Sequence, residues 1–137
     1  MKIVIAGAGE VGTHLAKLLT HEAQGIVVLD RDIDKLQYLD ANYNLMTMCG
    51  SPTSPRDLRH AGVRGCDLFI AVTPYESENV LACSIAKHYG ARQTMARVDS
   101  YEYIARDTTE FFDSIGVDNK VYPEVPISYT HLTLPTT

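Results

Sequence analysis

Residues 2–12 read KIVIAGAGEVG, an apolar run followed at once by a G-x-G-x-x-G motif formed by Gly7, Gly9 and Gly12. Such a motif is weak evidence when it stands alone. Here it directly follows a predicted strand, Lys2–Ala6, and opens a predicted helix, which is the context that makes it specific. The stretch therefore predicts a strand, a tight turn and a helix, the first unit of a doubly wound α/β fold.

Short apolar runs and helical patterns alternate along the rest of the chain, and several runs are apolar throughout, as in parallel strands covered on both faces. Six strands are expected at Lys2–Ala6, Ile26–Leu29, Leu45–Met48, Leu68–Val72, Thr94–Val98 and Val117–Val121. This order predicts a doubly wound, parallel, six-stranded sheet of the Rossmann type in a single domain that covers residues 1–124.

Helix signatures lie between these strands. Two helix starts show a hydroxyl residue followed by proline, at Ser54-Pro55 and at Thr73-Pro74, which predicts that Ser54 and Thr73 are N-cap residues. A further helical stripe of apolar residues comprises Tyr101, Ile104, Phe111, Phe112 and Ile115.

Composition excludes several classes of protein. The chain is 45% hydrophobic and 21% charged, which is typical of a globular domain. Its 137 residues are too few for a nucleotide domain plus a separate substrate domain. Twelve basic against 17 acidic residues give a net charge of −5, so nucleic-acid binding is not expected. The sequence contains no signal peptide and no apolar run of about 18 residues, which favours a cytosolic location.

The cysteines and histidines show no metal-ligand spacing. Cys49, Cys66 and Cys83 stand 17 residues apart, and the five histidines form no H-x-x-x-H pair. We expect free, mostly buried thiols and no metal site.

The segment 125–137 differs from the rest of the chain because it contains no charged residue and is rich in threonine and proline. It fits no element of the predicted fold. We interpret it as a non-native tail, with a native interdomain linker as the alternative.

The glycine turn is the first candidate binding site. Gly7 would allow the tight turn, Gly9 would let the backbone approach a pyrophosphate, and Gly12 would let the helix pack closely, while free N–H groups at the helix start face the phosphates. The alternative is that the glycines only close a turn between strand and helix. A Walker motif is excluded because Thr13 and His14 follow Gly12.

Asp30 ends the second predicted strand, 18 residues after Gly12. A carboxylate at this place accepts hydrogen bonds from ribose hydroxyls and repels a 2′-phosphate, which favours NAD or an adenosine nucleotide over NADP. Arg31 follows Asp30 directly, and its positive charge weakens the argument against NADP. The alternatives are a solvated strand end for Asp30 and a surface role for Arg31.

Three more residues belong to the candidate crevice because the carboxyl ends of parallel strands meet at one edge of the sheet. Thr73 and Pro74 follow the fourth predicted strand and would face the nucleotide even if Thr73 is an N-cap. Arg97 is a charge inside the fifth predicted strand and needs a partner, which would be a phosphate, a ribose or an internal carboxylate such as Glu78.

Residues 1–124 resemble the RCK, or KTN, nucleotide-binding domain of TrkA-like regulatory subunits of bacterial potassium uptake. The resemblance is carried, in order, by the turn Gly7–Gly12, the segments 28–32, 50–53, 71–73 and 78–79, and then by 96–98, 100–103 and 122–124. It implies that Gly7, Ala8, Gly9, Glu10 and Val11 surround the pyrophosphate, that Asp30 holds the adenosine ribose, and that Thr73, Pro74 and Arg97 line the cleft. Many members have an acidic residue where Ser51 stands, and full-length members continue with further domains.

The resemblance implies a cytoplasmic regulatory module, not an enzyme. It would bind NAD or NADH, with ATP or ADP as other candidates for the same cleft, form at least a homodimer, and lie at the inner face of the membrane through a Trk-type potassium translocator. The alternatives are the cofactor-binding half of an NAD-dependent dehydrogenase and an interaction scaffold with an empty nucleotide fold. No Tyr-x-x-x-Lys, G-x-S-x-G or recognisable catalytic His–carboxylate pair supports an enzyme.

Overall fold

The computed structural model describes residues 1–122 and contains six strands and six α-helices within them. The elements are β1 (Lys2–Ala6), α1 (Glu10–Leu19), β2 (Gly25–Asp30), α2 (Ile33–Asn42), β3 (Met46–Cys49), α3 (Pro55–Ala61), β4 (Leu68–Ala71), α4 (Glu76–His88), β5 (Thr94–Arg97), α5 (Tyr101–Ile104), the 3₁₀ turn η1 (Arg106–Thr108), α6 (Thr109–Ser114) and β6 (Asn119–Val121). The segment 125–137, predicted to be a tail, lies outside the described residues.

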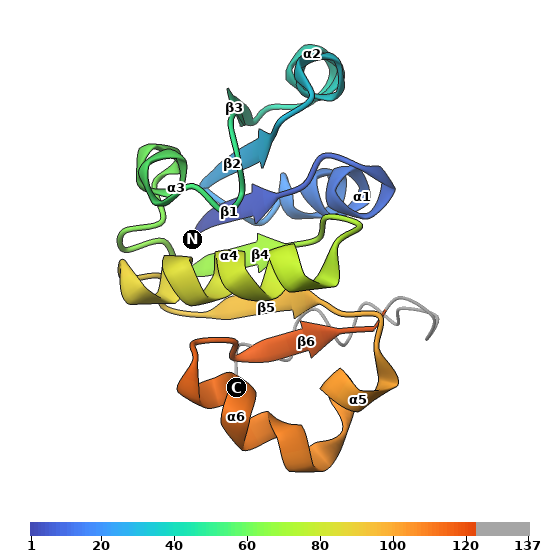
Figure 1. Ribbon diagram of the computed structural model, residues 1–137. Coiled ribbons are helices and arrows are strands. Elements are labelled where there is room, and N and C mark those ends of the chain that lie inside the picture. The colour runs from blue at the N-terminus through green and yellow to red at the C-terminus, as the bar shows by residue number, and fades with distance from the viewer. Residues whose placement is uncertain (123–137) are drawn as a thin grey trace.

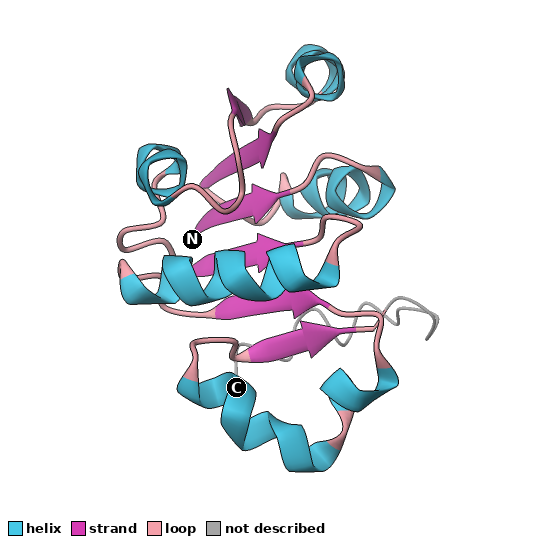
Figure 2. Ribbon diagram, in the orientation of Figure 1, coloured by secondary structure: helices cyan, strands magenta, loops and turns pink. Residues whose placement is uncertain are grey.

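All neighbouring strands pair in parallel, in the order β3-β2-β1-β4-β5-β6. Figure 1 shows this sheet with α4 crossing one face, and in Figure 2 the strand arrows end near the amino end of α4. The order reverses at β1 and β4, so a crevice is expected outside their carboxyl ends. The predicted doubly wound sheet is confirmed, with strand boundaries within two residues of those expected.

Two layers of core cover the sheet because successive residues of a strand point to opposite faces. Val4 and Ala6 of β1 belong to the core beneath α3, α4 and α6, whereas Ile3 and Ile5 pack with α1 and α2. Burial on both faces explains why β1, β2 and β4 have almost no polar residues.

The two predicted helix caps have different outcomes. Ser54 caps α3 as expected, its hydroxyl accepting a hydrogen bond from the Asp57 N–H at 3.1 Å, with Pro55 in the first turn. The predicted cap at Thr73 is wrong, since α4 begins at Glu76 and its N-cap is Tyr75. The Thr73 side chain has other partners, described below.

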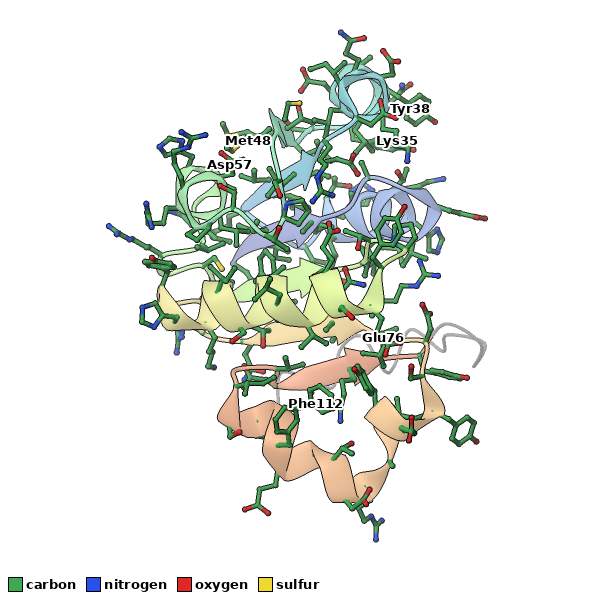
Figure 3. All side chains as sticks on the ribbon, in the orientation of Figure 1. Lys35, Tyr38, Met48, Asp57, Glu76 and Phe112 are labelled. Atoms are coloured by element: carbon green, nitrogen blue, oxygen red, sulfur yellow. The ribbon has the colours of Figure 1, made fainter. Side chains whose placement is uncertain are left out.

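The apolar stripe predicted between residues 101 and 115 does not form one helix. It is divided between α5 and α6 by the turn η1, where the Thr108 hydroxyl bonds the Ala105 carbonyl at 2.7 Å. Phe112 is buried and points toward the sheet in Figure 3, whereas Tyr101 and Phe111 are exposed.

The core predicts a clear difference between two leucine substitutions. Leu58 is fully buried in the core beneath α3 and α4, so Leu58→Ala is expected to lower the free energy of unfolding by about 2–5 kcal/mol. Leu18 of α1 is 39% exposed, and Leu18→Ala should cost less than about 1 kcal/mol. Urea unfolding measures both values, and equal losses would contradict the assigned core.

Candidate functional site

The glycine turn connects β1 to α1 and requires glycine at two positions, one for its backbone conformation and one for a packing contact. Gly7 has a φ of +116°, and a Cβ there would lie 3.1 Å from the backbone of Val72 and Thr73. A Cβ on Gly12 would overlap the carbonyl oxygen of Gly7. Helix α1 therefore packs directly on the turn, and Gly12 is required by this contact.

Gly9 differs from Gly7 and Gly12 because the space around it is open. A Cβ built there meets no atom within 4 Å. Gly9 is also the N-cap of α1, and no side chain caps that helix. The first N–H groups of a helix have no partner inside it, so this uncapped end can accept an anionic group.

Asp30 connects the end of β2 to this turn. One carboxylate oxygen accepts a hydrogen bond from the Ala8 N–H at 2.7 Å, and the other accepts one from the Asp32 N–H at 2.8 Å. Asp30 is therefore fixed by the backbone, unlike a carboxylate surrounded only by water. Each carboxylate oxygen can accept a second hydrogen bond, so ribose hydroxyls could still bind. The Ala8 N–H, in contrast, is already used.

Arg31 forms contacts on the opposite side of the crevice. Its guanidinium lies 2.8 Å from the Glu78 carboxylate and donates a second hydrogen bond to the Ser51 hydroxyl at 3.1 Å. The Arg31 side chain is 53% exposed and that of Glu78 only 15%. Glu78 is thus the partner of Arg31 and not of Arg97, the partner considered for it from the sequence.

Thr73 and Asn79 form a buried network at the end of β4. The Asn79 side-chain oxygen accepts hydrogen bonds from the Thr73 N–H at 2.9 Å and hydroxyl at 2.8 Å. The Asn79 amide nitrogen donates to the backbone carbonyls of Thr73 and Arg97 at 2.9 and 3.0 Å. Asn79 thus joins the ends of β4 and β5, while Pro74 lies exposed beside them.

Sequence reasoning did not assign this role to Asn79. The available signal is a polar residue in the otherwise apolar inner face of a helix, a position that demands several partners. The same reasoning missed Glu76, labelled in Figure 3 at the amino end of α4. One oxygen of its carboxylate accepts hydrogen bonds from the N–H groups of Asp99 and Ser100, both at 2.8 Å, and so holds the loop after β5.

Arg97 has a polar group without a partner. Its Nε atom is buried and forms no hydrogen bond, and the Asp99 carboxylate lies 3.7 Å away. A buried N–H without a hydrogen bond is costly, so a ligand that rearranges this side chain could satisfy it, which makes Arg97 a candidate donor to a bound ligand. The structure thus brings the glycine turn, Asp30, Arg31, Thr73 and Arg97 to the same edge of the sheet.

Two of the three thiols are poor nucleophiles. Burial raises the pKa of Cys66 to about 11 and raises the pKa of Cys83 further, so both stay protonated at neutral pH. Cys49 is exposed. Within residues 1–122, no cluster of three or more potential metal ligands occurs, and no helix is long and apolar enough to cross a membrane.

Comparison with known proteins by sequence finds TrkA proteins and their N-terminal domain. The sequence profile described as the TrkA-N domain matches residues 3–123. The Trk system potassium uptake protein TrkA of Haemophilus influenzae is 37% identical over 127 residues, which cover 90% of this chain and 28% of the relative. A TrkA homolog of Archaeoglobus fulgidus is 33% identical over 128 residues, which cover 93% of this chain and 29% of that relative. The chain therefore spans less than a third of these two relatives.

Solved structures with the same fold share less sequence. The TrkA-N domain of the Escherichia coli inner membrane protein ybaL has a TM-score of 0.76 and 19% identity, over 97% of this chain and 95% of that chain. The GsuK channel bound to NAD has a TM-score of 0.72 and 20% identity, over 88% of this chain and 21% of that one. GsuK bound to ADP also has a TM-score of 0.72.

The turn predicts opposite results for two similar substitutions. Gly12→Ala introduces a Cβ where the Gly7 carbonyl lies, and should lower the free energy of unfolding by roughly 2–3 kcal/mol because helix and turn must separate. Gly9→Ala places the same atom in open space and should change stability by less than about 1 kcal/mol. Thermal unfolding compares the two, and a Gly9 variant that loses as much as the Gly12 variant would refute this packing.

Proposed function

The chain belongs to the TrkA-N domain family, and from this premise we propose that it is the nucleotide-sensing part of a regulatory subunit of a Trk-type potassium uptake system. NAD or NADH binds in the crevice, with ATP and ADP as candidates for the same cleft. The ligand biases one of two arrangements of the transporter assembly by binding that arrangement more tightly. The observation that carries this proposal is the uncapped start of α1 joined by Asp30 to the end of β2.

The contacts of the crevice suggest how the ligand lies. The pyrophosphate occupies the open space over Gly9, where the first N–H groups of α1, from Glu10 and Val11, face it. The adenosine ribose donates its hydroxyl hydrogens to Asp30. On the other side, the Arg97 guanidinium, whose side chain is 24% exposed, donates to a phosphate or ribose oxygen, beside Thr73 and Pro74.

Relatives named Trk system potassium uptake protein support the choice of partner. The domain acts on the cytoplasmic side of the membrane and is held there by a Trk-type potassium translocator. Its ligand is a nucleotide and not a nucleic acid, which agrees with the net charge of −5.

A dehydrogenase cofactor domain is the rival function, and one experiment separates the two. The purified chain is titrated with NAD, NADH, ATP and ADP by calorimetry while absorbance reports any oxidation or reduction of the nicotinamide. The proposal predicts saturable binding of at least one nucleotide without turnover. Turnover would favour the enzyme, and no binding of any nucleotide would favour a scaffold.

We also propose that the domain forms at least a homodimer. Support comes from an open groove of about 560 Å³ between α4 and the α5–α6 segment, whose lining includes Val80, Leu81, Phe111 and Phe112. Leu81 is 50% exposed and Phe111 58% exposed. Burial of these side chains against a second copy would remove apolar surface from water, which favours association.

Light scattering tests this interface. The wild-type chain should have the mass of a dimer or larger, and Leu81→Glu should shift it toward the monomer because a charge in an apolar contact is costly. Leu18→Glu places the same charge on α1, outside the groove, and should leave the mass unchanged. A wild-type monomer at all concentrations, or equal effects of both variants, would show that this groove does not carry the interface.

Asp30 provides the sharpest test of the ligand's position. Two hydrogen bonds from ribose hydroxyls to a carboxylate contribute roughly 1.5–3 kcal/mol, so Asp30→Ala should weaken NAD binding by about 10- to 100-fold. NADP should lose less affinity than NAD, or gain some, because the charge that repels a 2′-phosphate is removed. The measurement is a pair of calorimetric titrations on the wild type and the variant.

Asp30→Asn serves as a second variant because it removes the charge while keeping an oxygen that can accept from the Ala8 N–H. It should show the same difference between NAD and NADP with a smaller loss of stability. Equal losses for both nucleotides, or no loss for either, would show that Asp30 does not contact the ribose.

A further inference from the structure

An ion pair joins the loop after β2 to the first turn of α4. The Nη1 atom of Arg31 lies 2.8 Å from Oε1 of Glu78, and Nη2 donates to the Ser51 hydroxyl at 3.1 Å. The Ser51 oxygen is held in turn by the Thr53 N–H at 3.3 Å. Both terminal nitrogens of the guanidinium therefore have partners.

The sheet order shows what this ion pair spans. β2 and β4 pair with opposite edges of β1, so their ends lie two strand spacings apart, roughly 10 Å. Arg31 follows β2 directly, and Glu78 lies on the helix after β4. The pair thus bridges the two strands on either side of β1, beside the glycine turn and next to Asp30.

The charges around Arg31 determine what this cation can do. It is the basic residue next to Asp30 and would be the natural donor to a phosphate on the 2′ position of an adenosine ribose. If a ligand phosphate bound the Arg31 guanidinium in place of Glu78, the Glu78 carboxylate, only 15% exposed, would lose its ion-pair partner. That carboxylate would then lie near the Asp30 carboxylate and the added phosphate, an arrangement of like charges that is unfavourable.

We propose that Glu78 is a specificity-determining residue: by holding the guanidinium of Arg31, it makes the crevice select nucleotides with a free 2′-hydroxyl over 2′-phosphorylated ones. The inference rests on the proposed function and deepens it. Asp30 repels the phosphate directly, whereas Glu78 withdraws the only neighbouring cation of the loop after β2 that could neutralise it. Discrimination therefore depends on a residue 48 positions away from Asp30 in the sequence.

Glu78→Gln tests the proposal because it removes the charge and keeps the shape of the side chain. NAD and NADP are titrated by calorimetry into the wild-type chain, the Glu78→Gln variant and the double variant Arg31→Ala/Glu78→Gln. We expect NADP to bind about tenfold more tightly to Glu78→Gln, because the released guanidinium forms a charge-assisted hydrogen bond, and NAD to change by less than about twofold. The double variant should lose the gain for NADP.

Glu76→Gln is the matched control. It removes a charge from the same helix turn, but that side chain contacts the N–H groups of Asp99 and Ser100 and not Arg31. An equal gain for NADP in this control would show a general charge effect and overturn the specificity role.

The remaining outcomes separate the two proposals. If the wild type binds NAD and Glu78→Gln leaves the ratio of NAD to NADP affinity unchanged, the role of Glu78 is wrong and the proposed function stands. If the gain persists in the double variant, Arg31 is not the residue released. If the wild type binds neither NAD nor NADP, the role of Glu78 is wrong, and the titrations with ATP and ADP decide whether the proposed function stands.

Discussion

The contact between Gly12 and the carbonyl of Gly7 is the constraint on which the rest of the site depends. A helix can approach the turn this closely only where a side chain is missing. Because α1 packs on the turn, its uncapped amino end faces the edge where the strands end. The same turn presents the Ala8 N–H to the Asp30 carboxylate, which places the carboxylate beside the helix end. The candidate anion site and the candidate acceptor for ribose hydroxyls therefore both depend on one packing contact.

The other side of the crevice is held by polar residues of α4. Asn79 joins the ends of β4 and β5 through backbone groups of Thr73 and Arg97, and Glu76 holds the loop after β5. Glu78, in the same helix turn, reaches across to Arg31. Three side chains from one turn thus connect loops from β2, β4 and β5, so a ligand between them would contact several parts of the domain at once. The proposed function would use these connections, because a ligand shifts an equilibrium only through the contacts that differ between two states.

Much of the fold could be predicted because its signals are local. Apolar runs mark strands buried on both faces, and the glycine motif identifies the first turn by its position between strand and helix. The cap at Ser54 was predictable for the same reason, but the similar pattern at Thr73 was misleading. Nothing near Thr73 in the sequence shows that its hydroxyl bonds Asn79, or that α4 starts only at Glu76. The partner of Glu78 was equally hidden, because Arg31 directly follows β2 and Arg97 ends β5, so both lie next to the crevice. Only the three-dimensional arrangement shows which of the two pairs with Glu78.

A crystal structure of the chain with NAD bound would show directly whether the nucleotide lies between the glycine turn and Asp30. We expect the pyrophosphate over Gly9 at the start of α1, with both ribose hydroxyls of the adenosine half within hydrogen-bond distance of the Asp30 carboxylate. A nucleotide bound at another edge of the sheet, or a ribose that does not contact Asp30, would contradict it.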